Sequence, residues 1–241
     1  MISSLELSNI LSRTSGQSME RLANEVFENT KNGELNKIYV ALHISMLNQL
    51  ANSKYIETLH NSSLYIDGIA VKILARKFGI QNLHLVPTTD LVPCILDKIK
   101  KSHQAFRIGL IGGDAHLIEE VSAILEKKYN VKVIFSLTGF PENWSYSDRE
   151  SIGISVDLLL IGMGVPLESI FAHEQVDNFN AHTVMTCGGL FGFLTGREKR
   201  APGFIRKIRM EWAWRLSQDP IRLGGRYLLG FINILRFIIR P

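Results

Sequence analysis

Residues 106–135 read FRIGLIGGDAHLIEEVSAILEKKYNVKVIF, and this stretch decides the fold. Residues 106–111 form a short apolar run typical of a buried strand, and Gly112, Gly113 and Asp114 follow as a turn. Residues 115–129 have amphipathic helical spacing, and a second apolar run follows at 131–135. A strand, a helix and a strand in this order predict a βαβ unit with parallel strands and a right-handed crossover.

The same pattern recurs along the chain. Apolar runs predict further strands at 37–42, 64–66, 156–161 and 183–187, and helical spacing marks 44–50, 69–78 and a helix that starts near Thr88. Residues 1–36 are mostly polar and predict no definite element. We therefore predict an α/β fold, in which an open, mostly parallel sheet of Rossmann-like type carries helices on both faces.

Composition excludes several classes of protein. The 241 residues are 46% hydrophobic and 21% charged, which is the balance of a globular protein and not of a disordered one. The two cysteines, Cys94 and Cys187, have no metal-binding spacing and fit a reducing compartment. The seven histidines are scattered and no Asp-x-Asp motif occurs, so we expect no metal site and no cofactor. We also expect neither a signal peptide nor a membrane-spanning helix.

Charge divides the chain into two parts. Residues 197–241 contain eleven Lys or Arg and three acidic residues, a formal charge of +8, which leaves −4 for residues 1–196. We predict an α/β core at 1–196, with an N-terminal part up to about residue 100 and a second part at about 101–196, and a basic appendage at 197–241. Such an appendage is expected to meet an anionic surface.

The appendage has the pattern of an interfacial helix. At about 100° per residue, Arg222, Arg226, Arg236 and Arg240 lie on one narrow stripe. The opposite face carries Phe231, Ile234, Leu235 and Ile238. This amphipathic arrangement predicts a helix that lies in a membrane interface, and the alternative is a helix packed on the core with a solvated arginine face. Interleaved Trp and Tyr residues favour lipid, and no nucleic-acid-binding motif accompanies the charge.

Paired glycines follow three of the predicted strands, namely Gly112 and Gly113, Gly162 and Gly164, and Gly188 and Gly189. Glycine-rich turns let backbone N–H groups approach a diphosphate beside a helix N-terminus. The alternative is that they only permit close packing, with Asp114 as a helix cap. Several such turns at one sheet edge favour a nucleotide crevice.

Asp67 follows the predicted strand at 64–66 and precedes a predicted helix. A carboxylate at such a strand end acts as a general base if a substrate hydroxyl reaches it. Most Asp-Gly pairs in this position are turns or helix caps, and the residues alone favour the cap.

At this point the chain resembles the WecG/TagA/CpsF family of bacterial glycosyltransferases over residues 37–230. The resemblance rests on an ordered set of motifs: LYIDGIAV (64–71), VPTTDLVP (86–93), IGLIGG (108–113), LIGMGVP (160–166), GGLFGFLTG (188–196), KRAP (199–202), EW (211–212), DPIR (219–222) and RY (226–227). Each motif alone is weak, and the ordered set is specific.

The resemblance implies an inverting, metal-independent transfer without a cofactor. The implied donor is a UDP-sugar, often UDP-N-acetylmannosamine or its uronic acid, and the acceptor is a sugar on undecaprenyl diphosphate. Asp67 matches the family base, which raises the base interpretation above the cap. The appendage is expected to dock the protein peripherally on the cytoplasmic face of the bacterial inner membrane.

Further site residues follow from the same resemblance. Candidate substrate- and nucleotide-binding residues are His43, Thr89, Asp90, Gly112, Gly113, Phe140, Gly162, Gly164, Gly188 and Gly189. Candidate ligands of the lipid or the diphosphate are Arg200, Arg206, Arg215, Arg222 and Arg226.

The chain also departs from the family pattern at positions that line the family's substrate site. Ala41-Leu42-His43 replaces Thr-x-Asn, Leu85 replaces an Arg, Glu168-Ser169 replaces Gln-Glu, and Gly192 replaces an Asp. The sugars therefore stay open, with UDP-glucose and UDP-glucuronate as further candidate donors, and Glu168 is a second candidate catalytic residue.

Two other functions are compatible with parts of the pattern. A nicotinamide-dependent oxidoreductase would share the sheet, but the chain has no GxGxxG motif. A catalytically silent, membrane-associated UDP-sugar-binding protein would explain the altered polar positions, although Asp67 is retained. The apolar tail also leaves a homo-oligomer open.

Overall fold

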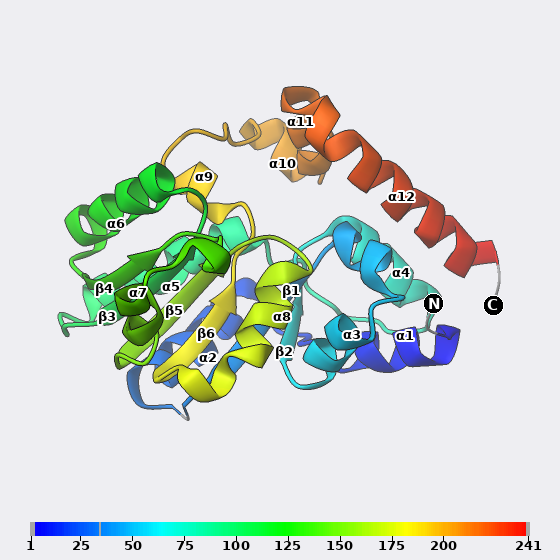
Figure 1. The fold of residues 1–241 in the computed structure, drawn as a ribbon. Helices are drawn as coiled ribbons and strands as arrows, with labels where there is room; N and C mark the ends of the chain where they lie inside the picture. Colours follow the sequence, from blue (N-terminus) through cyan, green and yellow to red (C-terminus); the bar gives the residue numbers. More distant parts are fainter. Residues whose placement is uncertain (1–2, 34, 240–241) are drawn as a thin grey trace.

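The computed structural model describes residues 3–33 and 35–239, and its centre is one six-stranded sheet (Figure 1). The strands are β1 (Lys37–Leu42), β2 (Ser63–Ile66), β3 (Arg107–Gly112), β4 (Lys132–Leu137), β5 (Val156–Gly162) and β6 (Ala181–Thr186). Their order is β2-β1-β6-β5-β3-β4, and every neighbouring pair is parallel. The predicted open α/β sheet is confirmed, and all of its pairings are parallel.

Helices cover both faces of the sheet. One face carries α2 (Met19–Asn32), α5 (Thr88–Lys101), α6 (Ala115–Tyr129) and α9 (Leu190–Leu194). The other carries α1 (Ser4–Ser12), η1 (Ile44–Gln49), α3 (Ser53–His60), α4 (Ile69–Lys77) and α8 (Leu167–Glu174). The connections hold η2 (Pro141–Asn143), α7 (Tyr146–Ser151) and η3 (Val176–Asn178). Two apolar cores result, one on each side, and together they explain the nearly continuous apolar strand β5.

The first 36 residues are more ordered than their composition predicts. Helix α1 buries Leu7, Ile10 and Leu11 completely. The residues that helix α2 buries are Leu22, Ala23, Val26 and Thr30. Each helix has a serine at its N-cap whose side chain accepts a backbone N–H. The polar residues that obscured these helices lie on their exposed faces.

The C-terminal segment consists of α10 (Gly203–Lys207), α11 (Glu211–Gln218) and α12 (Pro220–Ile239), drawn in orange and red across the top of Figure 1. Helix α12 contacts η1 and α4. A Cβ on Gly230 would lie 2.5 Å from Cγ1 of Ile44, so this glycine permits the close approach of α12 to the core.

The predicted apolar face of α12 needs a correction. Ile234 was expected to share one outward face with Phe231, Leu235 and Ile238, but it is buried with Phe237 in the core. A second apolar stripe points away from the core, and it consists of Ile221, Leu228, Ile232, Leu235 and Ile239. The helix therefore has two apolar faces, where the sequence analysis assumed one. Arg240 lies outside the described residues. No helix in the described ranges is long and apolar enough to cross a membrane.

Candidate active site

The carboxyl ends of the strands and the C-terminal helices enclose a cavity of about 480 Å³. Strand ends supply Asp67 after β2, His43 after β1 and Gly188 after β6. Helices α11 and α12 supply Arg215 and Arg226 from the other side. A cavity outside the carboxyl ends of parallel strands is the usual ligand site of an open α/β sheet.

Asp67 is placed by the backbone of β1. The N–H groups of Asp67 and Gly68 both donate to the carbonyl of Leu42, at 3.0 and 3.3 Å. The N-cap of α4 is Gly68, which makes no side-chain cap, and the Asp67 carboxylate accepts from the Thr88 hydroxyl at 3.0 Å. The cap interpretation of Asp67 is therefore wrong for this structure.

The surroundings of Asp67 favour its neutral form. Burial raises the pKa of Asp67 to about 6, while the hydrogen bond from Thr88 and the charge of Arg215 act in the opposite direction. A carboxyl group with this pKa exchanges its proton close to neutral pH.

Glu168 lies deeper in the same cavity and holds two turns together. Glu168 is only 2% exposed, and its Oε2 accepts hydrogen bonds from the N–H groups of Gly164 and Gly188, each at 2.9 Å. Burial raises the pKa of Glu168 to about 7, the backbone amides lower it, and the charge of Asp67 raises it further. The amides of Gly164 and Gly188 are thus engaged by a carboxylate of the chain itself.

Gly112 and Gly162 serve close packing. A Cβ on Gly112 would lie 2.4 Å from the carbonyl oxygen of Gly162, and a Cβ on either glycine would lie 2.9 Å from the ring of Phe191. The neighbouring Asp114 caps α6 by accepting the N–H of Leu117 at 2.8 Å. The geometry of Gly112 and Gly162 therefore supports close packing as their role, and that of Asp114 supports helix capping.

His43 is neutral in this cavity. Burial, and then the charges of Arg215 and Arg226, lower its pKa to about 4. The N–H of Ser45 donates to Nδ1 of His43 at 3.4 Å, so Nδ1 is an acceptor and the ring proton lies on Nε2. His43 is therefore a neutral side chain with one N–H donor, and it is not the base at neutral pH.

The five candidate arginines fall into different positions. Arg215 pairs with Glu198 at 3.2 Å and stacks 5.0 Å from the centre of the Phe193 ring. Arg226 lines the cavity and forms no ion pair with any residue that the structure describes. Arg222 pairs with both Glu198 and Asp219.

The remaining two arginines lie at the edge of the site. Arg200 lines the cavity, pairs with Asp90 and contacts the hydroxyl of Thr89. Arg206 is exposed on α10 and is not part of the cavity wall. Thr89 also lines the cavity, whereas Asp90 contributes through Arg200.

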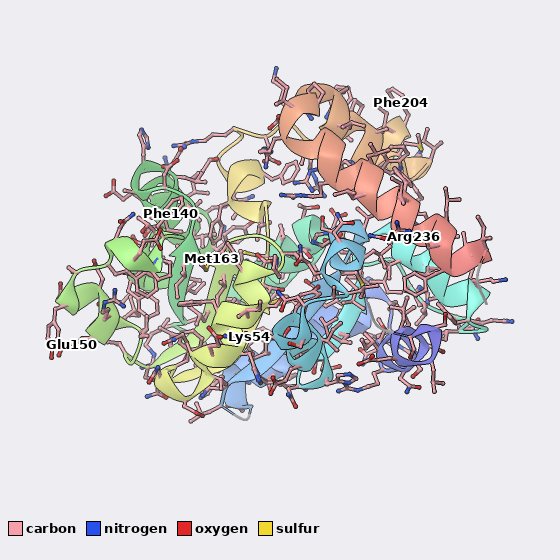
Figure 2. The ribbon with its side chains drawn as sticks, turned by 45° about the vertical axis from the view of Figure 1, so that its right-hand side comes forward. Lys54, Phe140, Glu150, Met163, Phe204 and Arg236 are labelled. Atoms are coloured by element: carbon pink, nitrogen blue, oxygen red, sulfur yellow. The ribbon has the colours of Figure 1, made fainter. Side chains whose placement is uncertain are left out.

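A second cavity of about 240 Å³ lies at the ends of β3 and β4. It is lined by Phe140, Trp144 and several polar groups, among them Asp114, Ser136 and Asn143. Phe140 is 48% exposed, and Figure 2 shows it on the green part of the chain, apart from Phe204 and Arg236 on the C-terminal helices. Most of the candidate residues thus line the larger cavity, and Phe140 lines the smaller one. Neither cavity wall includes Asp90, Gly112, Gly113, Gly162, Arg206 or Arg222.

Several wall residues of the larger cavity were not predicted from the sequence. Thr88, Thr186, Cys187 and Phe193 line it and were not among the candidates. Thr186 is the last residue of β6 and Cys187 follows it, next to Gly188, so their position at a strand end was the available signal. Within the described ranges, no three His, Cys, Asp or Glu side chains are grouped so as to hold a metal ion.

A sequence model of the glycosyl transferase WecG/TagA/CpsF family matches residues 8–241, nearly the whole chain. The chain belongs to this family. It is therefore a glycosyltransferase of cell-surface polysaccharide synthesis, with a nucleotide-sugar donor and a lipid-linked acceptor in general. The assignment sets aside a nicotinamide-dependent oxidoreductase and a catalytically silent protein.

Four of the positions that depart from the family pattern lie in the wall of the larger cavity, at Ala41, His43, Leu85 and Glu168. Gly192 is close to Glu198, since a Cβ there would lie 3.0 Å from the Glu198 side chain. The four changed residues in the wall therefore share this cavity with Asp67.

Proposed function

We propose that this chain is an inverting, metal-independent enzyme that transfers a hexose, N-acetylmannosamine-like or another, from a UDP-sugar to a sugar on undecaprenyl diphosphate. The observation that carries the proposal is Asp67, whose carboxyl group faces the 480 Å³ cavity and has a pKa of about 6. A general base is most effective when its pKa lies near the working pH. His43, which lines the same cavity, has too low a pKa to serve as the base at neutral pH, and its ring proton lies on Nε2.

The reaction is a single displacement. Asp67 takes the proton of the acceptor hydroxyl while the hydroxyl oxygen attacks the anomeric carbon from the face opposite UDP. The bond between this carbon and the diphosphate oxygen breaks, and UDP leaves with the electron pair, so the configuration inverts. Arg215 and Arg226, which line the same cavity, stabilise the negative charge of the diphosphates.

The smaller cavity is a suitable place for the nucleoside of the donor. Phe140 offers a half-exposed ring for stacking, and Asp114, Ser136 and Asn143 offer hydrogen-bonding groups. The glycine turns after β3 and β5 lie between this cavity and Asp67 in the sheet order. A donor bound along this edge would have its sugar directed toward Asp67.

The C-terminal segment is a suitable membrane-docking element on the cytoplasmic face of the inner membrane. Its outward residues include Ile221, which is 96% exposed, and Phe204, which is 68% exposed. Lys72 of α4 lies near Arg76 and Arg209. Burial, and then the charges of these two arginines, lower the pKa of Lys72. Exposed apolar side chains close to a group of cations, one of which, Arg209, lines the cavity, suit a lipid-linked, anionic acceptor.

Binding of UDP and a panel of UDP-sugars, measured by calorimetry with NAD as the control, tests the proposal. We expect binding of UDP with a Kd on the order of micromolar, preference for one sugar, and no binding of NAD. A Phe140→Ala variant should weaken UDP binding about tenfold, since base stacking is lost. Absence of UDP binding, with and without anionic lipid, would refute the proposed donor.

A further inference from the structure

A buried chain of two hydroxyl groups lies behind Asp67. The Tyr65 hydroxyl is 2.9 Å from Oγ1 of Thr88, and Oγ1 of Thr88 is 3.0 Å from Oδ2 of Asp67. Tyr65 is 1% exposed and Thr88 is 4% exposed, so bulk water does not compete for these hydrogen bonds. Two buried side chains thus connect the core of the sheet with the carboxylate in the cavity.

The direction of these hydrogen bonds follows from the groups involved. An ionised carboxylate only accepts, so the single hydroxyl proton of Thr88 is donated to Asp67. Oγ1 of Thr88 must then accept from Tyr65. Burial, followed by the charge of Asp67, raises the pKa of Tyr65 well above its usual value, so Tyr65 keeps the proton that it donates. The order of donation is Tyr65 to Thr88 to Asp67.

The backbone brings the three groups together. Tyr65 and Asp67 are two residues apart, at and just beyond the end of β2, so their side chains point to the same face of the sheet. Thr88 is the first residue of α5, and the N–H of Val86 donates to the carbonyl of Ile66 at 2.7 Å, which fixes the start of α5 beside β2. The contact therefore does not depend on a mobile loop.

We propose that Thr88, supported by Tyr65, is a positioning residue that holds Asp67 in the orientation needed to take the acceptor proton. The donated hydrogen bond occupies Oδ2 and leaves Oδ1 for the acceptor hydroxyl. It also stabilises the ionised form of Asp67, which counteracts the effect of burial on the pKa of this carboxyl group. The inference rests on the proposed role of Asp67 as the base.

The test compares Thr88→Val, Thr88→Ser and Tyr65→Phe with the unmodified protein in transfer assays over about pH 5 to 9, with the donor concentration varied up to saturation. Valine keeps the shape of Thr88 but lacks the hydroxyl. Transfer requires ionised Asp67, so the pH of half-maximal activity follows the pKa of Asp67. In Thr88→Val the ionised carboxylate loses a hydrogen bond, so this pKa rises and the pH midpoint of activity should move up by about one unit. We expect kcat to fall about tenfold with little change in the KM of the donor.

The other two variants separate positioning from packing. Serine restores the hydroxyl, so Thr88→Ser should return the pH midpoint to its original value. Tyr65→Phe removes only the second donor and should shift the midpoint in the same direction by less. A Thr88→Val variant that folds normally, as judged by circular dichroism and thermal melting, and keeps the original pH midpoint would overturn the proposal.

A second readout does not need turnover. The ¹³C shift of the Asp67 carboxyl, assigned with Asp67→Asn, titrates with the pKa of this group. An upward shift of the titration in Thr88→Val, reversed in Thr88→Ser, supports the hydrogen-bond chain even if no transfer is detected, in which case the proposed function alone fails. An unchanged titration sinks the inference, whatever the activity.

Discussion

Asp67 and Glu168 are two carboxyl groups in one cavity with different surroundings. Asp67 lines the cavity and accepts a hydrogen bond from the Thr88 hydroxyl at Oδ2, whereas Oε2 of Glu168 is occupied by the N–H groups of Gly164 and Gly188. The engaged oxygen and low exposure of Glu168 make it a clamp between two strand-end turns. We therefore propose Asp67 as the group that takes the proton, and Glu168 as the group that holds the turns at Gly164 and Gly188 together.

This difference predicts how stability responds to pH. Burial raises the pKa of Glu168 from 4.5 in its unperturbed state to about 7, so its contribution to stability is complete below about pH 4.5 and is lost as the pH rises through 7. In Glu168→Gln, the amide oxygen accepts the same two N–H groups and does not titrate. We compare the free energy of unfolding in urea of Glu168→Gln with that of the unmodified protein. The difference should favour the variant more at pH 8 than at pH 5, by roughly 2–3 kcal/mol.

Glu150 of α7, labelled in Figure 2, is an exposed control for this measurement. Glu150→Gln should give the same small change in the free energy of unfolding at both pH values. A Glu168→Gln effect that is independent of pH would show that Glu168 is already ionised or fully solvated in the folded protein.

At the scale of elements, strands were easier to predict than terminal helices. The strand at 37–42 was predicted with the bounds that β1 has, because both faces of the sheet are covered and the strands are nearly all apolar. Helices α1 and α2 were missed, because each buries only one narrow side. The spacing of Leu7, Ile10 and Leu11, three and four residues apart, was the signal that pointed to α1.

The site was predictable to the extent that it depends on strand ends. Asp67, His43 and Gly188 follow parallel strands, so their meeting at one edge follows from the topology. The contact of Thr88 with Asp67 joins residues 21 positions apart and has no periodic pattern that would reveal it. The role of Gly112 likewise depends on Phe191, which packs on it from a distant element.

The two apolar faces of helix α12 have different surroundings, and this difference leads to a testable prediction. The inward face packs on the core through Ile234 and Phe237, and the outward stripe is exposed. Replacing Leu228, Ile232 and Leu235 by serine should reduce co-sedimentation with anionic liposomes about tenfold or more, since each loses apolar area that the bilayer would bury. Circular dichroism should show an unchanged fold.

The matched control for α12 is a serine at Leu5 of α1 together with one at Ile154, which are 71% and 47% exposed. This variant should bind liposomes like the unmodified protein. If the outward-stripe variant sediments as well as the control, the outward stripe is not a membrane contact, and self-association becomes the better explanation for it.

At the scale of the whole molecule, the C-terminal segment closes the larger cavity through a small set of polar contacts. Glu198 pairs with Arg215 of α11 and with Arg222 of α12, each at 3.2 Å. Arg200 pairs with Asp90 of α5, and Asn233 of α12 donates to the carbonyl of Leu47 at 3.0 Å. The cavity wall therefore depends on contacts between parts of the chain that are far apart in sequence.

Glu198→Gln should loosen this closure without unfolding the core. Hydrogen exchange should become faster in α11 and the first half of α12, while the strands keep their protection, because half-exposed ion pairs contribute about 1 kcal/mol or less to global stability. Glu119→Gln, an exposed change on α6 with no ion pair among the described residues, is the control. Exchange in α11 equal to that of the control would show that Glu198 does not hold the segment.

The central claim is that Asp67 is the base of a transfer from a UDP-sugar, and Asp67→Asn tests it most directly. Asparagine keeps the size of the side chain but does not take a proton. Transfer to the lipid-linked acceptor should fall about 100-fold or more, while the Kd for UDP, measured by calorimetry on the same preparation, changes by less than about twofold. Transfer at the unmodified rate, with UDP bound normally, would contradict the account.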